Sequence, residues 1–256
     1  SADGQLWGNP LYRWERMKED GFGWWIRRVE GAGRLFDVLR IDHFRGFESY
    51  WSVPFGAETA REGKWVKGPG GELVKVLTQW FYQMDFIAED LGILTPEVHR
   101  LLEESGLPGV KVLEFAFDPT AQSSYLPHRY ERNCVCYVGT HDNAPVMAWR
   151  AEAAPQEVAL AQRYLGLNEA EGFAWGMLRG GMSSVADLFV AQMQDYLELG
   201  AESRMNTPGK ASGNWSWRLR GGELTAQLAE KIADMTRLYG RAPRSAAAEG
   251  SAAEKG

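Results

Sequence analysis

Hydrophobic residues recur along the chain with two different spacings, which predict alternating helices and strands. Spacings of three and four residues predict helices over residues 9–33, 72–84, 95–107, 155–167, 171–182 and 224–240. Nearly continuous apolar runs predict strands over residues 34–41, 85–90 and 110–117, a strand running into a polar cluster over 134–143, and a strand followed by a turn over 186–197. Such strands alternating with helices favour an α/β fold with a parallel sheet.

Polar clusters follow three of these strands, where each strand ends. The clusters read RIDHFRG (residues 40–46), IAEDLG (87–92) and GTHDN (139–143). Parallel sheets build their active sites at the carboxyl ends of the strands, both in a closed (β/α)8 barrel and in an open doubly wound sheet. Neither GxGxxG nor GxxxxGK[ST] follows a strand, which argues against a nucleotide-binding sheet.

Composition and charge narrow the class of protein. A net charge of −6 argues against nucleic acid as the main partner, because a phosphate backbone attracts a basic surface. No apolar run reaches the ~18 residues of a membrane span, and no signal peptide is recognisable. The two cysteines, Cys134 and Cys136, are too close along one strand to bond well with each other. We therefore expect a cytoplasmic protein with reduced cysteines and no zinc site.

The chain contains eleven tryptophans. Two interpretations stay open: the indole rings form a tryptophan-rich core, or some of them are platforms on which sugar rings stack.

Three acids stand in the polar clusters: Asp42, Glu89 and Asp142. Each follows a run that we expect to be buried, and an ionised carboxylate is costly to bury unless it is paired. Carboxyls that share a pocket push their pKa values apart, as an acid and a nucleophile in glycoside chemistry require. Structural interpretations also exist: an ion pair of Asp42 with Arg40 or Arg45, a helix N-cap made by Glu89 and Asp90, and a turn at Asp142.

Basic side chains flank two of these acids. Arg40 lies two residues before Asp42, so both side chains point to the same side of a strand, and a neighbouring guanidinium favours an ionised carboxylate. His43 and His141 stand beside acids and can hydrogen-bond sugar hydroxyls. His43 could instead be a buried histidine bonded to a backbone carbonyl.

Together with RMNTPG (204–209), GNWSWR (213–218) and the opening GQLWGNPLYRW (4–14), these clusters resemble the 4-α-glucanotransferases, also called amylomaltases. The resemblance covers about residues 1–240. It implies a (β/α)8 TIM-type barrel, of which this chain holds roughly strands four to eight. Family members are roughly twice as long, so the N-terminal half of the barrel is expected in the full-length protein. Residues 241–256 are small and polar, which predicts a disordered tail.

The resemblance assigns roles to single residues. It implies that Asp42 is the nucleophile, Glu89 the general acid/base and Asp142 the acid that stabilises the transition state. The expected substrate-binding residues are Arg40, His43, His141, Trp7 and Asn214. The implied substrates are α-1,4-glucans, such as maltooligosaccharides and fragments of starch or glycogen, transferred without a metal or other cofactor.

This chain departs from the family pattern at two places. Glu114 stands where we expect Gln, and it could shift pKa values nearby or meet a basic partner. Ala144–Pro145 follow the GTHDN cluster where many members have Asp and Thr.

Two alternatives to an active glucanotransferase stay open. They are an α-glucan hydrolase of the same clan and a catalytically incompetent fragment of such an enzyme.

Overall fold

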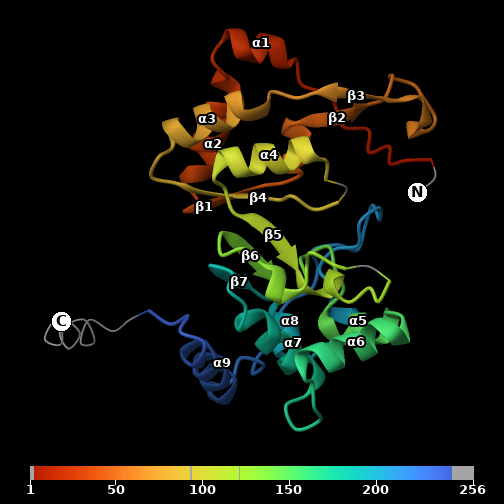
Figure 1. The fold of residues 1–256 in the computed structure, drawn as a ribbon, viewed down its shortest axis with the longest axis vertical. Coiled ribbons are helices and arrows are strands. Elements are labelled where there is room, and N and C mark those ends of the chain that lie inside the picture. Colours follow the sequence, from red (N-terminus) through yellow and green to blue (C-terminus); the bar gives the residue numbers. More distant parts are fainter. Residues whose placement is uncertain (1–2, 93, 121, 244–256) are drawn as a thin grey trace, which may run out of the picture. The chain divides into compact units, whose positions relative to one another are not determined.

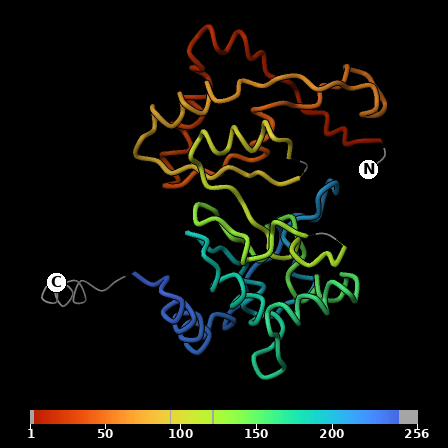
Figure 2. Tube along the Cα trace, viewed as in Figure 1, coloured from red at the N-terminus to blue at the C-terminus, as the bar shows by residue number. Residues whose placement is uncertain are grey.

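The computed structural model describes residues 3–92, 94–120 and 122–243. The chain forms two compact units, Ser1–Val110 and Lys111–Gly256, whose described parts run from red to yellow and from green to blue in Figure 2. Strand β5 (Gly109–Val112) crosses the boundary. Of the tail predicted over residues 241–256, residues 244–256 lie outside the described part. Arg241 is held in place, because its guanidinium donates to the carbonyls of Met182 and Ser184.

Unit 1 is built around the parallel strands β1 (Val38–Ile41) and β4 (Asp85–Ala88). Its helices are α1 (Trp14–Glu19), α2 (Gly23–Gly33), α3 (Gly70–Trp80) and α4 (Pro96–Ser105), and α3 packs against α2 and α4 (Figure 1). Buried side chains of α3 and β4 meet Phe44 and Phe47 of the short 3-10 helix η1 (Phe44–Phe47) in one core.

The helix predicted over residues 9–33 is two helices in the structure. Gly21 (φ 68°) and Phe22 (φ 60°) adopt left-handed backbone conformations between α1 and α2. The ring of Phe22 is buried in the core of unit 1. This burial offsets the cost of a left-handed non-glycine residue, which is roughly 1–2 kcal/mol.

The strand predicted over residues 34–41 is shorter and more exposed than expected. Pairing begins at Val38, and Leu35 and Phe36 are 76% and 58% exposed. Both residues come before the strand, at the end of α2, where their N–H groups donate to the carbonyl of Ala32 at 2.9 and 3.0 Å, so they are not part of the sheet. The expectation of a buried run before Asp42 is therefore wrong.

An antiparallel ribbon that the hydrophobic pattern did not predict follows η1. Strands β2 (Ser49–Ser52) and β3 (Lys64–Lys67) pair with Trp51 opposite Trp65, and the 3-10 helix η2 (Ala60–Glu62) lies in their connection. The two indole rings meet edge to face with their centroids 5.3 Å apart, and such cross-strand aromatic pairs stabilise a ribbon. In Figure 2 this orange ribbon projects from the rest of unit 1.

Unit 2 contains a sheet in the order β5–β6–β7, with β6 (Cys134–Tyr137) parallel to β7 (Leu188–Val190). Its helices are α5 (Val146–Glu152), α6 (Pro155–Leu165), α7 (Phe173–Met182), α8 (Met193–Tyr196) and α9 (Ala226–Leu238), with 3-10 helices η3 (Leu113–Ala116), η4 (Pro127–Arg129) and η5 (Ala201–Ser203). In α7 every residue except Arg179 is buried, and α7 packs against α5, α6, α8 and α9. Parallel strands alternating with helices confirm the predicted α/β class.

Three segments of unit 2 differ from the sequence prediction. The strand predicted over residues 110–117 ends at Val112 and continues as η3. The turn predicted after β7 is the short helix α8. Helix α5 was not predicted, and its first N–H, that of Val146, is capped by Oδ1 of Asp195 at 2.8 Å, a residue 49 positions away.

Both cysteines, Cys134 and Cys136, are free, as the sequence predicted, and both are buried. Burial raises the pKa of the Cys136 thiol to about 12. In the part of the chain that the structure describes, no helix has both the length and the apolar character that crossing a membrane requires.

Candidate active site

Two of the predicted acids lie next to each other at the carboxyl ends of β1 and β4. Asp42 directly follows Ile41 and Glu89 directly follows Ala88, and Ile41 and Ala88 are register partners. The N–H of Glu89 donates to the carbonyl of Ile41, and the N–H of Phe44 donates to the carbonyl of Glu89, both at 2.9 Å. Parallel pairing thus continues past the strands and brings the two acidic clusters of unit 1 together.

Backbone N–H groups hold the carboxylate of Glu89 at both oxygens. Oε2 accepts from the N–H of His43 at 2.7 Å and Oε1 from the N–H of Leu91 at 2.8 Å. The residue is buried. Each carboxylate oxygen has two lone pairs, so each can accept a further hydrogen bond.

Neither Glu89 nor Asp90 caps helix α4. The N-cap of α4 is Thr95, and Oδ1 of Asp90 accepts from the N–H of Val110 at 2.6 Å. The N-cap interpretation of this pair is therefore wrong.

Asp42 is exposed, contrary to the expectation of a buried carboxylate. Its side chain is 81% exposed, and its Oδ1 lies 3.5 Å from Nη2 of Arg40. Asp42 stands one residue beyond β1, in a turn. An ion pair this exposed contributes at most about 1 kcal/mol, so the contact orients the carboxylate more than it stabilises the fold.

His43 acts through its main chain. It adopts a left-handed conformation (φ 49°), its N–H donates to Glu89, and its carbonyl accepts from the N–H of Gly46 at 2.8 Å. The residue is exposed, so the interpretation as a buried, carbonyl-bonded histidine is wrong. Its ring is accessible to a ligand.

The GTHDN cluster of unit 2 is a tight polar turn after β6. Both the N–H and Oγ1 of Thr140 donate to Oδ1 of Asn143, at 3.0 and 2.8 Å. The N–H of Asp142 donates to Oγ1 of Thr140 at 3.3 Å. The turn interpretation of Asp142 is correct, and this local network fixes its main chain.

The side chain of Asp142 is held by the segment after η5. Nδ2 of Asn206 donates to Oδ1 of Asp142 at 2.5 Å, and Nε2 of His141 lies 3.5 Å from Oδ2. Arg204 donates through Nη2 to the main-chain carbonyl of Asp142 at 2.7 Å and through Nε to that of Asn206 at 2.9 Å. Neither Arg204 nor Asn206 is among the site residues predicted from the sequence, although both lie in the RMNTPG motif.

Asn214 holds its own loop. Its Oδ1 accepts from the N–H of Thr207 and its Nδ2 donates to the carbonyl of Lys210, both at 2.9 Å. The next residue, Trp215, has a left-handed backbone (φ 60°), and its ring lies 5.2 Å from that of His141. Asn214 thereby shapes the loop that places an indole beside the GTHDN turn.

The tryptophans divide between the two interpretations of the sequence. Trp175 is buried in the core of unit 2, whereas Trp7 and Trp215 are 59% and 54% exposed. Trp7 lies in an irregular segment of unit 1, where its Nε1 donates to the side chain of Gln5 at 3.4 Å. Exposed indole faces are available for stacking on sugar rings.

Two further carboxyls, Glu114 and Asp195, are buried in unit 2, at 6% and 1% exposure. Burial raises the pKa of Glu114 well above its usual range, and the charge of Asp195 adds to this effect. Burial raises the pKa of Asp195 to about 6, although the N–H of Val146 opposes the shift. Of the two outcomes that the sequence left open for Glu114, a basic partner is present, because the charge of Arg204 lowers its pKa, but burial and the charge of Asp195 outweigh it.

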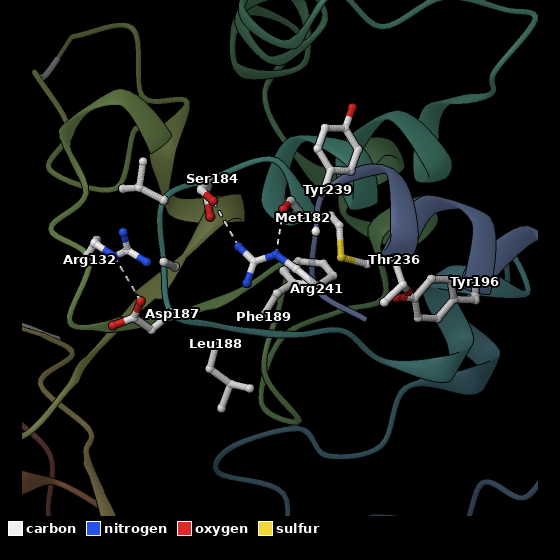
Figure 3. Close-up of a pocket in the computed structure, with 13 residues that line it drawn as sticks. Arg132, Met182, Ser184, Asp187, Leu188, Phe189, Tyr196, Thr236, Tyr239 and Arg241 are labelled. Carbon is white, nitrogen blue, oxygen red and sulfur yellow. Dashed lines mark hydrogen bonds and ion pairs between the residues drawn. The ribbon is translucent and has the colours of Figure 1, made fainter. Parts of the chain in front are cut away.

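Figure 3 shows a cavity of about 700 Å³ in unit 2 that contains none of the predicted site residues. It borders residues 184–189, at the amino end of β7, whereas the GTHDN turn follows the carboxyl end of the parallel strand β6. Arg132 is paired with Asp187 at 3.3 Å, and Arg241 is bonded to main-chain carbonyls. Among the described residues, no group of three or more His, Cys, Asp or Glu could hold a metal ion.

Comparisons with known proteins agree with one another. A family model described as 4-alpha-glucanotransferase matches residues 1–225. The 4-alpha-glucanotransferase of Clostridium butyricum is 47% identical over 242 residues, covering 94% of this chain and 50% of that protein. The enzyme of the same name from Thermus thermophilus is 48% identical, covering 92% of this chain and 48% of that protein. The chain spans about half the length of the curated relatives that it matches.

Solved structures show the same likeness. The amylomaltase of Streptococcus agalactiae, solved in complex with acarbose, superimposes with a TM-score of 0.89 at 38% identity, covering 94% of this chain and 49% of that one. The amylomaltase of Corynebacterium glutamicum superimposes with a TM-score of 0.73 at 21% identity, covering 94% of this chain and 41% of that one. At this identity the likeness shows that the two chains share a fold. On sequence and structure together, this chain belongs to the 4-alpha-glucanotransferase family.

Proposed function

We propose that this chain carries the catalytic carboxyls of a retaining 4-α-glucanotransferase, which moves α-1,4-glucan segments from one maltooligosaccharide to another. The observation that carries the proposal is the placement of Asp42 and Glu89 after register partners of two parallel strands. Retaining glycoside chemistry uses two carboxyls about 5–5.5 Å apart. The acarbose complex of the Streptococcus relative supports a carbohydrate ligand.

In the first half-reaction, the exposed carboxylate of Asp42 attacks the anomeric carbon of the donor glucan. The bond from that carbon to the leaving oxygen breaks, and Glu89 gives its proton to this oxygen. In the second, Glu89 takes the proton of an acceptor's 4-hydroxyl, and this oxygen displaces Asp42. Two inversions leave the α configuration unchanged. The backbone bonds of Glu89 keep its carboxyl in one place through both steps.

We assign Asp142 the role of stabilising positive charge at the anomeric carbon in the transition state. Its bonds to Asn206 and Arg204 support a fixed carboxylate. Arg40, His43, His141 and Trp7 are proposed substrate contacts, and Asn214 is proposed to contribute by shaping its loop.

For the fold, we propose that β1, β4, β5, β6 and β7 are strands four to eight of a (β/α)8 barrel, within a catalytic region over residues 1–240. The full-length protein would supply the first three strands. The coverage of about half of each relative supports this assignment. The two free cysteines support a reducing, cytoplasmic location.

The test is a product assay with maltotriose. It uses this chain alone and this chain fused after the N-terminal half of the Thermus thermophilus relative. A transferase yields glucose and longer maltooligosaccharides, whereas a hydrolase yields shorter products only. An active fusion beside an inactive chain would mean that residues 1–256 need the other half.

The variant Asp42→Asn should abolish the product ladder of the active protein without changing its circular dichroism spectrum. Asp37→Asn is the matched control, because Asp37 is exposed just before the same strand, and it should stay active. Near-normal turnover by Asp42→Asn would overturn the assignment of the nucleophile.

A further inference from the structure

The carboxyl of Glu114 lies directly against the main chain of Gly139, the first residue of the GTHDN turn. A Cβ atom placed on Gly139 would be 3.0 Å from the Cδ and from both carboxyl oxygens of Glu114. The N–H of Glu114 donates to the carbonyl of Val138 at 3.1 Å. The carboxyl thus fills the space that a side chain at position 139 would need, three residues before Asp142.

The surroundings of Glu114 favour its uncharged form. Burial has the largest effect and raises the pKa of Glu114. The charges of Asp195 in α8 and of Glu152 at the end of α5 raise it further, and the charge of Arg204 lowers it. Its Oε1 atom has no hydrogen-bond partner among the described residues, which is tolerable for a neutral acid and costly for a carboxylate.

The opposing cation is already engaged elsewhere. Arg204 donates to the main-chain carbonyls of Asp142 and Asn206, and Asn206 donates to the carboxylate of Asp142. A negative charge on Glu114 would attract the guanidinium away from these carbonyls, and it would also repel Asp195. The position of Asp142 therefore depends on the protonation of a residue that does not touch it.

We propose that Glu114 is a positioning residue: as the neutral acid it supports Gly139 and leaves Arg204 bonded to Asp142, and its ionisation loosens the turn that carries Asp142. The consequence for catalysis rests on the proposed function. The structural claim does not, so the two can be tested separately.

His141 provides a readout that requires no substrate. Its ring lies 3.5 Å from the carboxylate of Asp142 and 5.2 Å from the ring of Trp215, so a small movement of the turn changes its ring current. The chain has four histidines, and their ring protons are well separated from other signals in a proton NMR spectrum. His141→Gln identifies the signal.

The experiment follows this signal from acidic to alkaline pH in the wild-type chain, in Glu114→Gln and in Glu169→Gln. The glutamine at 114 is a permanently neutral isostere, and Glu169 is an exposed acid of the same unit. We expect the wild type and the control to show a step that follows the ionisation of Glu114. We expect this step to be lost in Glu114→Gln, whose signal below it matches the wild type.

Two results would overturn the proposal. One is an identical pair of titration curves for the wild type and Glu114→Gln. The other is a His141 signal in Glu114→Gln that matches the wild type only above this step, since that would show that the turn is built around a charged Glu114.

A second measurement tests whether the ionisation of Glu114 changes enzymatic activity. In an active protein, Glu114→Gln should match the wild-type kcat at pH values below this step and lose the fall in kcat that follows ionisation of Glu114. An unchanged pH profile would contradict the link to catalysis. Absence of activity in every variant would instead count against the proposed function and leave the NMR result to decide the structural claim.

Discussion

The main-chain N–H of His43 donates a 2.7 Å hydrogen bond to Oε2 of Glu89. This bond joins the residue after one predicted catalytic acid to the carboxylate of the other. The bond therefore links the loop after β1 to the loop after β4 at the place where the chemistry is proposed. A change in the carboxyl of Glu89 is expected to disturb the position of Asp42.

Replacing Glu89 by Gln should destabilise unit 1 as well as abolish transfer. Glutamine has one side-chain oxygen, so one of the two N–H groups that now bond Glu89, those of His43 and Leu91, would face an NH2 group. An unsatisfied buried donor costs about 1–3 kcal/mol, and because both bonds are only part-buried we expect a loss of about 1 kcal/mol, at the lower end of that range. Urea unfolding measures this loss. Glu103→Gln, on the exposed face of α4, should change stability by less than about 0.5 kcal/mol, and equal stability of both variants would contradict the prediction.

Position 43 should tolerate glycine better than a β-branched residue. His43 has a φ of 49°, a conformation that costs non-glycine residues roughly 1–2 kcal/mol. His43→Gly should therefore be more stable than His43→Val by about this amount in urea unfolding. If both variants lose the same stability, the imidazole ring rather than the backbone stabilises the turn.

Asp195 should make the protein less stable as the pH rises from about 4 to about 6. Its pKa is about 6 in the folded protein against a usual 3.8, so the folded state binds more protons in this range and its advantage disappears as the proton leaves. The difference of about two pKa units corresponds to about 3 kcal/mol. Asp195→Asn, whose side-chain oxygen can still accept from Val146, should remove this dependence. Parallel stability curves of the two proteins across this range would show that Asp195 titrates normally.

Asn206 and Asn214 should differ in what their loss affects. Asn206→Ala removes a bond to the carboxylate of Asp142, and bonds to charged groups contribute about 1.5–3 kcal/mol, so kcat should fall about ten- to a hundredfold. Asn214→Ala removes two bonds within the loop and should speed its cleavage by a protease. Faster cleavage of Asn206→Ala than of Asn214→Ala would reverse this assignment.

The sequence predicted the parts of the site that depend on strand ends. Asp42 and Glu89 were found because each follows an apolar run, and parallel register then places them together. Their difference in exposure could not be predicted, because the pattern of one strand does not show which of its edges is paired. Asn206 was missed because nothing in the irregular segment after η5 tells which of its two asparagines reaches Asp142.

Helix α5 was missed for a similar reason. Its seven residues give too short a period to recognise, and its start is stabilised by Asp195, which lies 49 positions later in the chain. The ribbon β2–β3 also depends on a contact made after folding, the pairing of Trp51 with Trp65 across their connection. Local pattern carries little information about elements whose caps and partners are distant in sequence.

The burial of both native thiols makes this chain suitable for single-site labelling. Cys134 and Cys136 are shielded from solvent, and a thiol with a pKa of about 12 is almost never the reactive thiolate at neutral pH. A cysteine introduced in place of an exposed residue such as Tyr82, which is 79% exposed, would then be the one group that a maleimide dye modifies. A fluorescent or spin probe can therefore be attached at a chosen position without first removing a native cysteine.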